Sequence, residues 1–165
     1  MTAMGGALGP VLYAFEAVLH RCPNDAATGG QHTDEWGEWP ILAVPREALS
    51  QPLAIGFDAA IERLARLPRM FVEPDGSFVW TSPAADHPWQ VDGNLFERSG
   101  RVLLVDLKGS CPAAEFDWLL GAFGWPEEPV MLGLVLAAVF LDPVTFCRHA
   151  AARGAAGDGQ TLRPR

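Results

Sequence analysis

Positive charge is scarce in this chain of 165 residues, which has 12 lysine and arginine residues against 20 aspartate and glutamate residues. Lys108 is the only lysine. The resulting net charge of −8 gives the molecule no overall field that attracts nucleic acid or anionic lipid. We therefore expect neither a nucleic acid nor a membrane as a partner.

Long apolar runs and paired cysteines are also lacking. The longest apolar run, residues 130–141, has about a dozen residues, whereas a membrane-spanning helix needs about 20. The N-terminus lacks the cationic segment of a secretory signal. The three cysteines are widely spaced and include no Cys-x-x-Cys pair, which is typical of reduced thiols. These features indicate a cytoplasmic protein, and a hydrophobic content of 49% excludes a largely disordered chain.

Acidic residues gather in two stretches that contain neither lysine nor arginine: residues 22–40, with four acids, and residues 111–145, with five. Trp36 and Trp39 lie in the first stretch. Aromatic side chains beside acids are suited to anchor a basic segment of another protein. Alternatively, the two rings fold this segment back onto the domain, because a tryptophan exposed on a loop is unfavourable.

The pattern of apolar residues and turn residues divides the chain into three parts. Residues 1–40 are predicted to form an N-terminal helix, at residues 11–19, and an acidic loop. Residues 41–153 are predicted to form a single core domain, and residues 154–165 a disordered tail. Within the core we expect a helix from Ser50 to about Arg66, hairpins at residues 70–80 and 90–108, a helix from Ser110 to about residue 123 and a last helix from Asp142 to Arg153.

Residues 130–141 are apolar at almost every position, so their periodicity leaves a strand, a helix or a strand continuing into a helix open. We favour a strand at their start. The predicted fold class is α+β: a mostly antiparallel sheet of two consecutive β-hairpins plus a further strand, covered by helices.

Three charged residues of the second hairpin can meet on one face of the sheet. Alternation puts Asp92 on one face of its strand and puts Asp106 and Lys108 together on one face of the next, so the register decides whether the two sets meet. If a three-residue turn pairs Glu97 with Arg101, the two aspartates stand directly opposite each other, about 5 Å apart between Cβ atoms. Such carboxylates beside an ammonium group would bind Mg²⁺ or Mn²⁺ and activate a water. Alternatively, the aspartate and lysine merely end a central strand, and the ammonium group reaches to water.

The Val-Asp-Gly segment at residues 91–93 and the Asp-Leu-Lys segment at residues 106–108 resemble the motif of the PD-(D/E)XK nucleases. The resemblance implies a metal-dependent phosphodiesterase, in which the two aspartates bind the metal and the lysine orients the attacking water. It further implies a glutamate from a helix in the metal site, for which Glu62 and Glu73 are candidates.

Two further sets of residues have weaker patterns. His20, Cys22 and His32 are conceivable zinc ligands, although their spacing is unlike that of zinc fingers and a fourth ligand is missing. Cys111 at the start of a predicted helix would have a lowered pKa, with His87 or His149 brought near by the fold, but a packed, inert thiol is the alternative.

Two functions from different classes follow from these features. The first is a non-catalytic module that binds or scaffolds another protein through its acidic surface and Trp36 and Trp39. The second is a phosphodiesterase of PD-(D/E)XK type. No cofactor is expected for the first function, and Mg²⁺ or Mn²⁺ is expected for the second.

Overall fold

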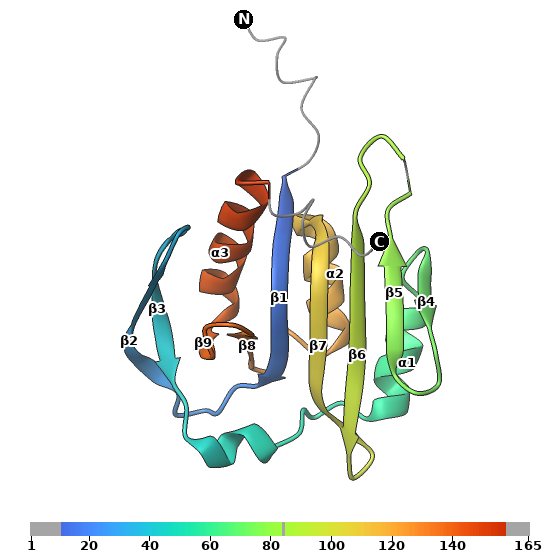
Figure 1. Ribbon diagram of the computed structural model, residues 1–165. Coiled ribbons are helices and arrows are strands. Elements are labelled where there is room, and N and C mark those ends of the chain that lie inside the picture. Colours follow the sequence, from blue (N-terminus) through green and yellow to red (C-terminus); the bar gives the residue numbers. More distant parts are fainter. Residues whose placement is uncertain (1–10, 84, 158–165) are drawn as a thin grey trace, which may run out of the picture.

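The computed structural model describes residues 11–83 and 85–157. The elements in these ranges are β1 (Leu12–Arg21), β2 (Ala27–Asp34), β3 (Gly37–Ala43), the 3-10 helix η2 (Arg46–Ser50), α1 (Phe57–Ala65), β4 (Met70–Val72), β5 (Ser77–Thr81), β6 (Gln90–Arg98), β7 (Arg101–Pro112), α2 (Ala113–Ala122), β8 (Val130–Leu134), β9 (Val139–Leu141) and α3 (Pro143–Ala155). All nine strands belong to one antiparallel sheet with the order β2-β3-β9-β8-β1-β7-β6-β5-β4 (Figure 1). No helix in the described ranges is long and apolar enough to cross a membrane.

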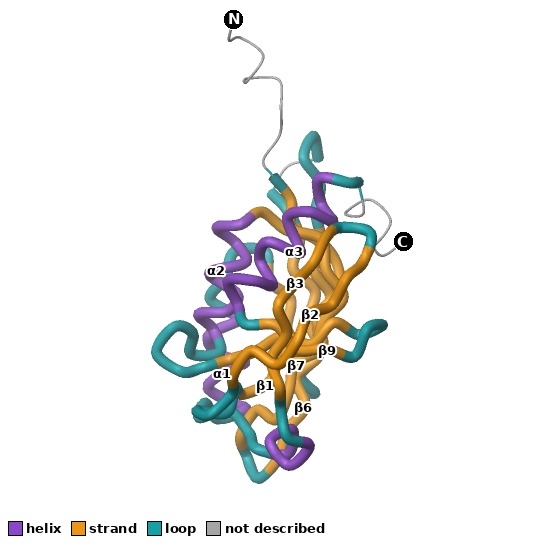
Figure 2. The backbone as a smooth tube through the Cα atoms, turned by 90° about the vertical axis from the view of Figure 1, so that its left-hand side faces the viewer, coloured by secondary structure: helices purple, strands orange, loops and turns teal. Residues whose placement is uncertain are grey.

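The three α-helices pack on the same side of the sheet, as the view turned by 90° shows (Figure 2). Side chains of the strands alternate accordingly. In β7, Val105 and Leu107 are buried in the core beneath the helices, whereas Asp106 and Lys108 are exposed. In the part of the chain that the structure describes, no helix covers the opposite side of the sheet, which we call the open face.

This architecture corrects the predicted α+β fold class, because the molecule is mainly β and its sheet holds more than two hairpins and one further strand. The predicted N-terminal helix is wrong. Its residues form β1, which lies in the middle of the sheet between β7 and β8. Phe15, Ala17 and Leu19 of β1 are buried in the core, while Glu16 and Val18 alternate with them on the open face. The high apolar content at all positions conceals this period of two.

The predicted acidic loop is also wrong, since residues 21–39 contain most of the β2–β3 hairpin. β2 forms an edge of the sheet and is largely exposed, so its sequence carries little apolar alternation. Gly37 follows the turn at Glu35 and Trp36 and takes a φ of 144°, which glycine adopts at low cost. Residues 12–40 thus supply strands to the same sheet as the predicted core. Residues 158–165 of the predicted tail lie outside the described residues.

The helices predicted from Ser50 and Ser110 start later than expected. The residues at their predicted starts either bond to strand β7 or belong to it. The N–H of Leu53 donates to the carbonyl oxygen of Val102 in β7, at 2.8 Å, so the chain stays extended there. α1 begins only after Gly56. Ser110 itself belongs to β7.

Four predicted elements are confirmed, and one of them is the hairpin at residues 90–108, which is formed by β6 and β7. Residues 70–80 form the β4–β5 hairpin, with Gly76 at a φ of 96° in its turn. Residues 130–141 begin as strand β8, although a turn and the short strand β9 follow. The side chain of Asp142 caps α3 by accepting from the N–H of Thr145 at 2.9 Å.

α3 packs against β1 and lies between β1 and the β2–β3 hairpin in the view of Figure 1. β8 pairs only with the second half of β1, from Ala17 to Arg21. The end of α3 packs on the first half, where a Cβ atom on Gly154 would overlap the carbonyl oxygen of Leu12. This close packing brings α3, the β2–β3 hairpin and the turn between β8 and β9 around a cavity next to β1.

Candidate functional site

A row of paired residues crosses the open face over five neighbouring strands. Phe71 of β4 pairs with Val79 of β5, which pairs with Asp92 of β6. Asp92 pairs with Lys108 of β7, and Lys108 pairs with Glu16 of β1. Lys108 therefore has an acidic residue as its cross-strand neighbour on either side, an arrangement of charges that offsets the repulsion between the two acids.

The pairing of Asp92 with Lys108 corrects the predicted register. The β6–β7 turn has two central residues, Ser99 and Gly100, with φ values of 54° and 81°, and a β-bulge follows. Two-residue turns of this kind fit the twist of the strands better than the predicted three-residue turn. Asp92 consequently does not stand opposite Asp106.

Asp92, Asp106 and Lys108 nevertheless line one hollow of about 400 Å³ on the open face, together with Glu16. Partial burial raises the pKa of Asp106. The carboxylate of Asp92 accepts a hydrogen bond from the side chain of Gln90 at 2.9 Å. The hollow therefore combines three carboxylates and one ammonium group with apolar side chains such as Val18 and Val135.

Neither glutamate proposed to complete a metal site lines this hollow. Glu62 lies on α1, on the helix side of the sheet, and Glu73 lies in the turn between β4 and β5. Within residues 11–83 and 85–157, no group of three or more histidine, cysteine, aspartate or glutamate side chains is arranged to hold a metal ion.

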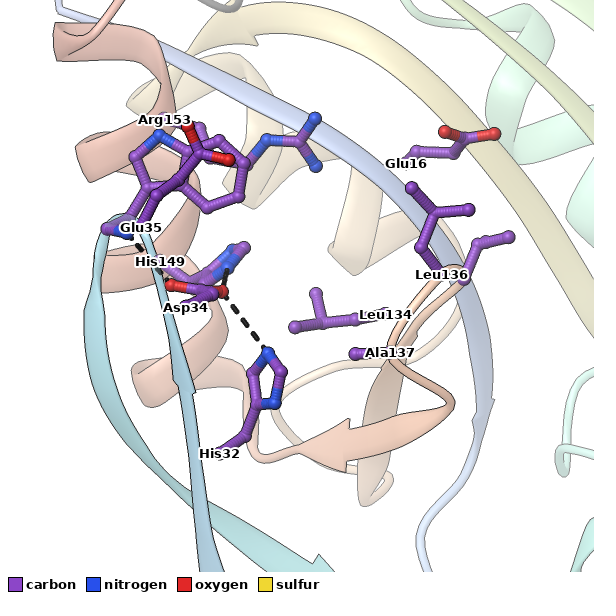
Figure 3. Close-up of a pocket in the computed structure, with 11 residues that line it drawn as sticks. Glu16, His32, Asp34, Glu35, Leu134, Leu136, Ala137, His149 and Arg153 are labelled. Carbon is purple, nitrogen blue, oxygen red and sulfur yellow. Dashed lines mark hydrogen bonds and ion pairs between the residues drawn. The ribbon is translucent and has the colours of Figure 1, made fainter.

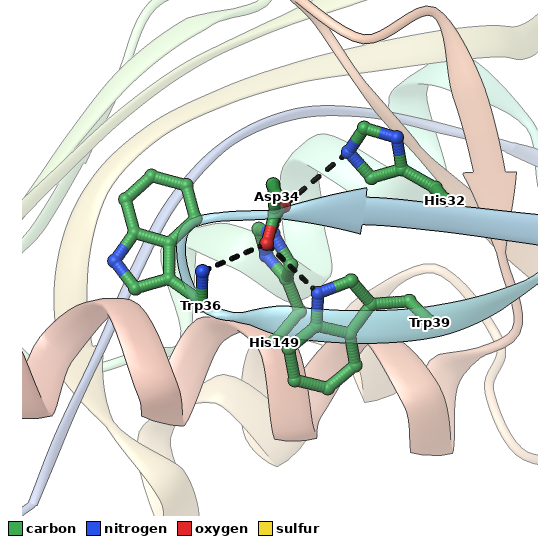
Figure 4. A network of polar contacts seen from close by, with 5 residues as sticks. All are labelled: His32, Asp34, Trp36, Trp39 and His149. Atoms are coloured by element: carbon green, nitrogen blue, oxygen red, sulfur yellow. Dashed lines mark hydrogen bonds and ion pairs between the residues drawn. The ribbon is translucent and has the colours of Figure 1, made fainter.

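A second polar cluster centres on Asp34 at the tip of the β2–β3 hairpin (Figure 4). One carboxylate oxygen accepts from the backbone N–H of Trp36 and from Nε1–H of Trp39, both at 3.0 Å. The other lies 2.8 Å from Nε2 of His149 on α3 and 3.3 Å from Nε2 of His32. Asp34 thus connects the hairpin to α3, across more than a hundred residues of sequence.

Trp36 and Trp39, the predicted partner anchors, both pack edge-on against His149, with ring centroids 5.5 and 5.1 Å away. These contacts fit the alternative in which the rings fold the segment back onto the domain. A role of either ring in partner binding stays a prediction. Trp36 is better placed for it, because its ring also lines a cavity.

This second cavity, of about 290 Å³, lies between the hairpin tip, α3 and the β8–β9 turn (Figure 3). His32, Asp34 and Trp36 form one side of it, and the turn forms an apolar side. The guanidinium carbon of Arg153 lies 4.7 Å from the centroid of the Trp36 ring, within the range of a cation–π contact. Glu16 lines this cavity as well as the first hollow.

The pKa values of the cluster follow from its burial and hydrogen bonds. Partial burial works to raise the pKa of Asp34, but the hydrogen bonds from Trp39, His149 and Trp36 outweigh it, so the pKa is lowered. The imidazole of His149 is almost fully buried, and burial lowers its pKa despite the nearby carboxylate. A neutral imidazole that donates to an ionised Asp34 is the state that these shifts favour.

The remaining candidates are not brought together into a site. His20 is buried edge-on against Phe140, and burial lowers its pKa. The thiol of Cys22 donates to the carbonyl oxygen of Pro23, and His32 belongs to the Asp34 cluster. Cys111 is fully buried in β7, and burial raises its pKa well above the ordinary value, which agrees with the packed, inert thiol and not with the reactive one.

Comparisons of the chain with protein-family models, with curated proteins and with solved structures found no match.

Glu16, Asp34 and His149 are the site residues that the sequence did not reveal. Glu16 could have been found from the alternating apolar residues around it, which predict a strand with this carboxylate on its polar face. No local signal links Asp34 to His149, because only the packing of the hairpin on α3 brings them together.

Proposed function

We propose that the domain is a non-catalytic protein-binding module whose partner docks on the open face of the sheet. One observation carries the proposal: the helices cover only one side of a nine-stranded sheet, and large apolar side chains are exposed on the other. Phe71 is 67% exposed, Phe96 41% and Val79 36%. Exposed apolar side chains that surround charged groups are typical of protein-interaction surfaces.

A metal-dependent phosphodiesterase is the rival function. The observation in its favour is that Asp92, Asp106 and Lys108 line one hollow. The lysine stands between two cross-strand carboxylates, however, and this pairing accounts for its position without any reaction. We therefore rank protein binding first.

Photo-cross-linking from the two sides of the sheet tests the proposal. A photoreactive amino acid replaces Val79 on the open face in one variant, and Glu62 on α1 in the other. Position 79 is expected to capture a partner that position 62 does not. The purified partner should then bind the Phe71→Ser/Val79→Ser variant at least about tenfold more weakly, since aromatic anchors often carry more than 1 kcal/mol.

Two outcomes argue against the proposal. Capture from both positions alike would indicate unspecific contact. An unchanged affinity of a variant that keeps its fold, checked by its circular dichroism spectrum, would show that the open face is not the docking surface.

A further inference from the structure

We infer that the partner contributes an extended, basic segment, which crosses β1 in a single groove formed by the two cavities of the open face. The inference rests on the proposed function, and it adds the chemistry of the partner and the path of its chain.

The two cavities form one groove because they share a wall. Glu16 and Val135 line both of them. The N–H of Val135 donates to the carbonyl oxygen of Glu16 at 3.3 Å, which holds the β8–β9 turn against β1 between the cavities. A segment that crosses β1 at this point therefore contacts the hollow around Lys108 on one side and the cavity around Trp36 on the other.

The charge of the groove favours a basic occupant. Among the described residues, five carboxylates line the groove and Lys108 and Arg153 are its two permanent cations; the carboxylates belong to Glu16, Asp34, Glu35, Asp92 and Asp106, of which Asp34 is engaged by its own hydrogen bonds. Lys108 stands between two of these acids, and Arg153 lies over the Trp36 ring. The excess of negative charge attracts a basic segment and opposes an acidic one.

The walls of the groove suit aliphatic side chains between the basic ones. The β8–β9 turn supplies an apolar wall of Leu134, Val135, Leu136 and Ala137, in which Leu136 is 93% exposed. Successive side chains of an extended chain point to opposite sides. A segment that alternates basic and aliphatic residues can therefore direct its basic side chains to the carboxylates and its aliphatic side chains to this apolar wall.

A nuclear magnetic resonance titration tests the inference. The ¹⁵N-labelled full chain is titrated with a synthetic peptide of about eight residues that alternates lysine and leucine. Amide shift changes are expected to concentrate around Glu16, Asp106 and Val135. The affinity should fall as salt is added, because exposed charges are screened.

Three variants make the test specific. Glu16→Gln should weaken peptide binding about two- to fivefold, the effect of losing one exposed ion pair. Lys108→Gln should strengthen binding by a similar factor, because it removes a cation from the groove. Glu62→Gln, which removes a carboxylate on the helix side, should leave the affinity unchanged.

Shift changes spread evenly over the molecule, equal weakening by Glu62→Gln and Glu16→Gln, or equal binding of a peptide that alternates glutamate and leucine would each overturn the inference. Failure here is distinguishable from failure of the proposed function. If the peptide does not bind but a partner is still captured from position 79, only the basic segment and its path are wrong.

Discussion

Asp34 is the residue on which the position of the β2–β3 hairpin depends most. Its carboxylate accepts from Trp36 and Trp39 of its own hairpin and lies 2.8 Å from Nε2 of His149 on α3. Because α3 also lines the groove, the same contacts hold the shape of the second cavity. The candidate docking site therefore depends on a residue whose own role is structural.

Replacing Asp34 by alanine is expected to lower the free energy of unfolding by about 2–3 kcal/mol. The substitution removes an ionised acceptor and leaves the buried donors of Trp39 and His149 without a partner. Urea denaturation measures the change. Glu38→Ala, which removes an exposed carboxylate from the same hairpin, should stay within about 0.5 kcal/mol of the parent chain. Equal effects of the two substitutions would contradict the account.

The same cluster predicts that stability falls on acidification. Asp34 has a lowered pKa in the folded state, so its contribution is present above its unfolded pKa and is lost as the pH falls through the folded value. His149 also has a lowered pKa, so below about pH 6.5 the unfolded state takes up a proton that the folded state resists. Both Asp34 and His149 therefore lower the free energy of unfolding as the pH falls.

Melting temperatures recorded from pH 5 to pH 2 measure the contribution of Asp34, with Asp34→Asn as the reference. The parent chain should lose more stability below about pH 4 than the variant, which lacks the carboxyl group that titrates there. Between pH 7 and pH 5 the loss belongs to His149, whose pKa the carboxylate of Asp34 raises, so the variant should lose no less than the parent chain in that range. His32 and Arg153 also face the cluster and are present in both chains. Parallel curves would show that the cluster does not contribute.

At the scale of elements, the sequence predicts best where local signals and packing agree. The β4–β5 hairpin has a proline and a glycine in its turn, and α3 has Asp142 as its cap, so both are predictable from a few residues. β1 is not, because its apolar content suits a helix as well as a strand. Only pairing with β7 and β8 on both sides decides for the strand.

The charged residues of the open face are likewise predictable only in part, because some of their positions follow from local signals and others from distant contacts. Alternation correctly places Asp106 and Lys108 on one face of their strand, but whether Asp92 meets them depends on the register, which the turn at Ser99 and Gly100 and the β-bulge beside it determine. A change of one residue in that turn exchanges the partner of every position. The contribution of Glu16 depends in turn on β1, which is far away in the sequence.

The packing of α3 on β1 gives a prediction at this scale. Gly154→Ala is expected to destabilise the protein by about 1–3 kcal/mol, because the added Cβ overlaps the carbonyl oxygen of Leu12. Gly121→Ala in α2 is the matched control. Apart from its chain neighbours and the backbone of its own helix, no described atom lies within 4 Å of its added Cβ, so the higher helix propensity of alanine should raise stability by up to about 1 kcal/mol. Shifts of the same sign in both variants would mean that α3 does not pack on β1 in this way.

In the molecule as a whole, the described helices lie on one side of the sheet, and this feature of the fold is the basis of the proposed function. The helices bury one face, and the other presents apolar side chains at Phe71 and Phe96 around a groove with excess negative charge. The net charge of −8 agrees with a basic partner. The same charge opposes the phosphodiester substrate of the rival function.

Metal ions separate the two functions. A native metal site would raise the melting temperature on addition of Mg²⁺ or Mn²⁺, because a ligand that binds only the folded state stabilises it. We expect no rise at millimolar concentrations. A rise that disappears in Asp106→Asn would establish the metal site and favour the phosphodiesterase.

The central claim is that a partner covers the open face, and methyl resonances of the full chain test it most directly. Spectra are recorded with and without the partner captured from position 79, and the methyl groups of Val18 and Val135 on the open face are compared with those of Val144, which is 60% exposed on α3. Because the partner covers the open face, the signals of Val18 and Val135 should shift and those of Val144 should not. Shifts at Val144 with unchanged signals from Val18 and Val135 would contradict the central claim.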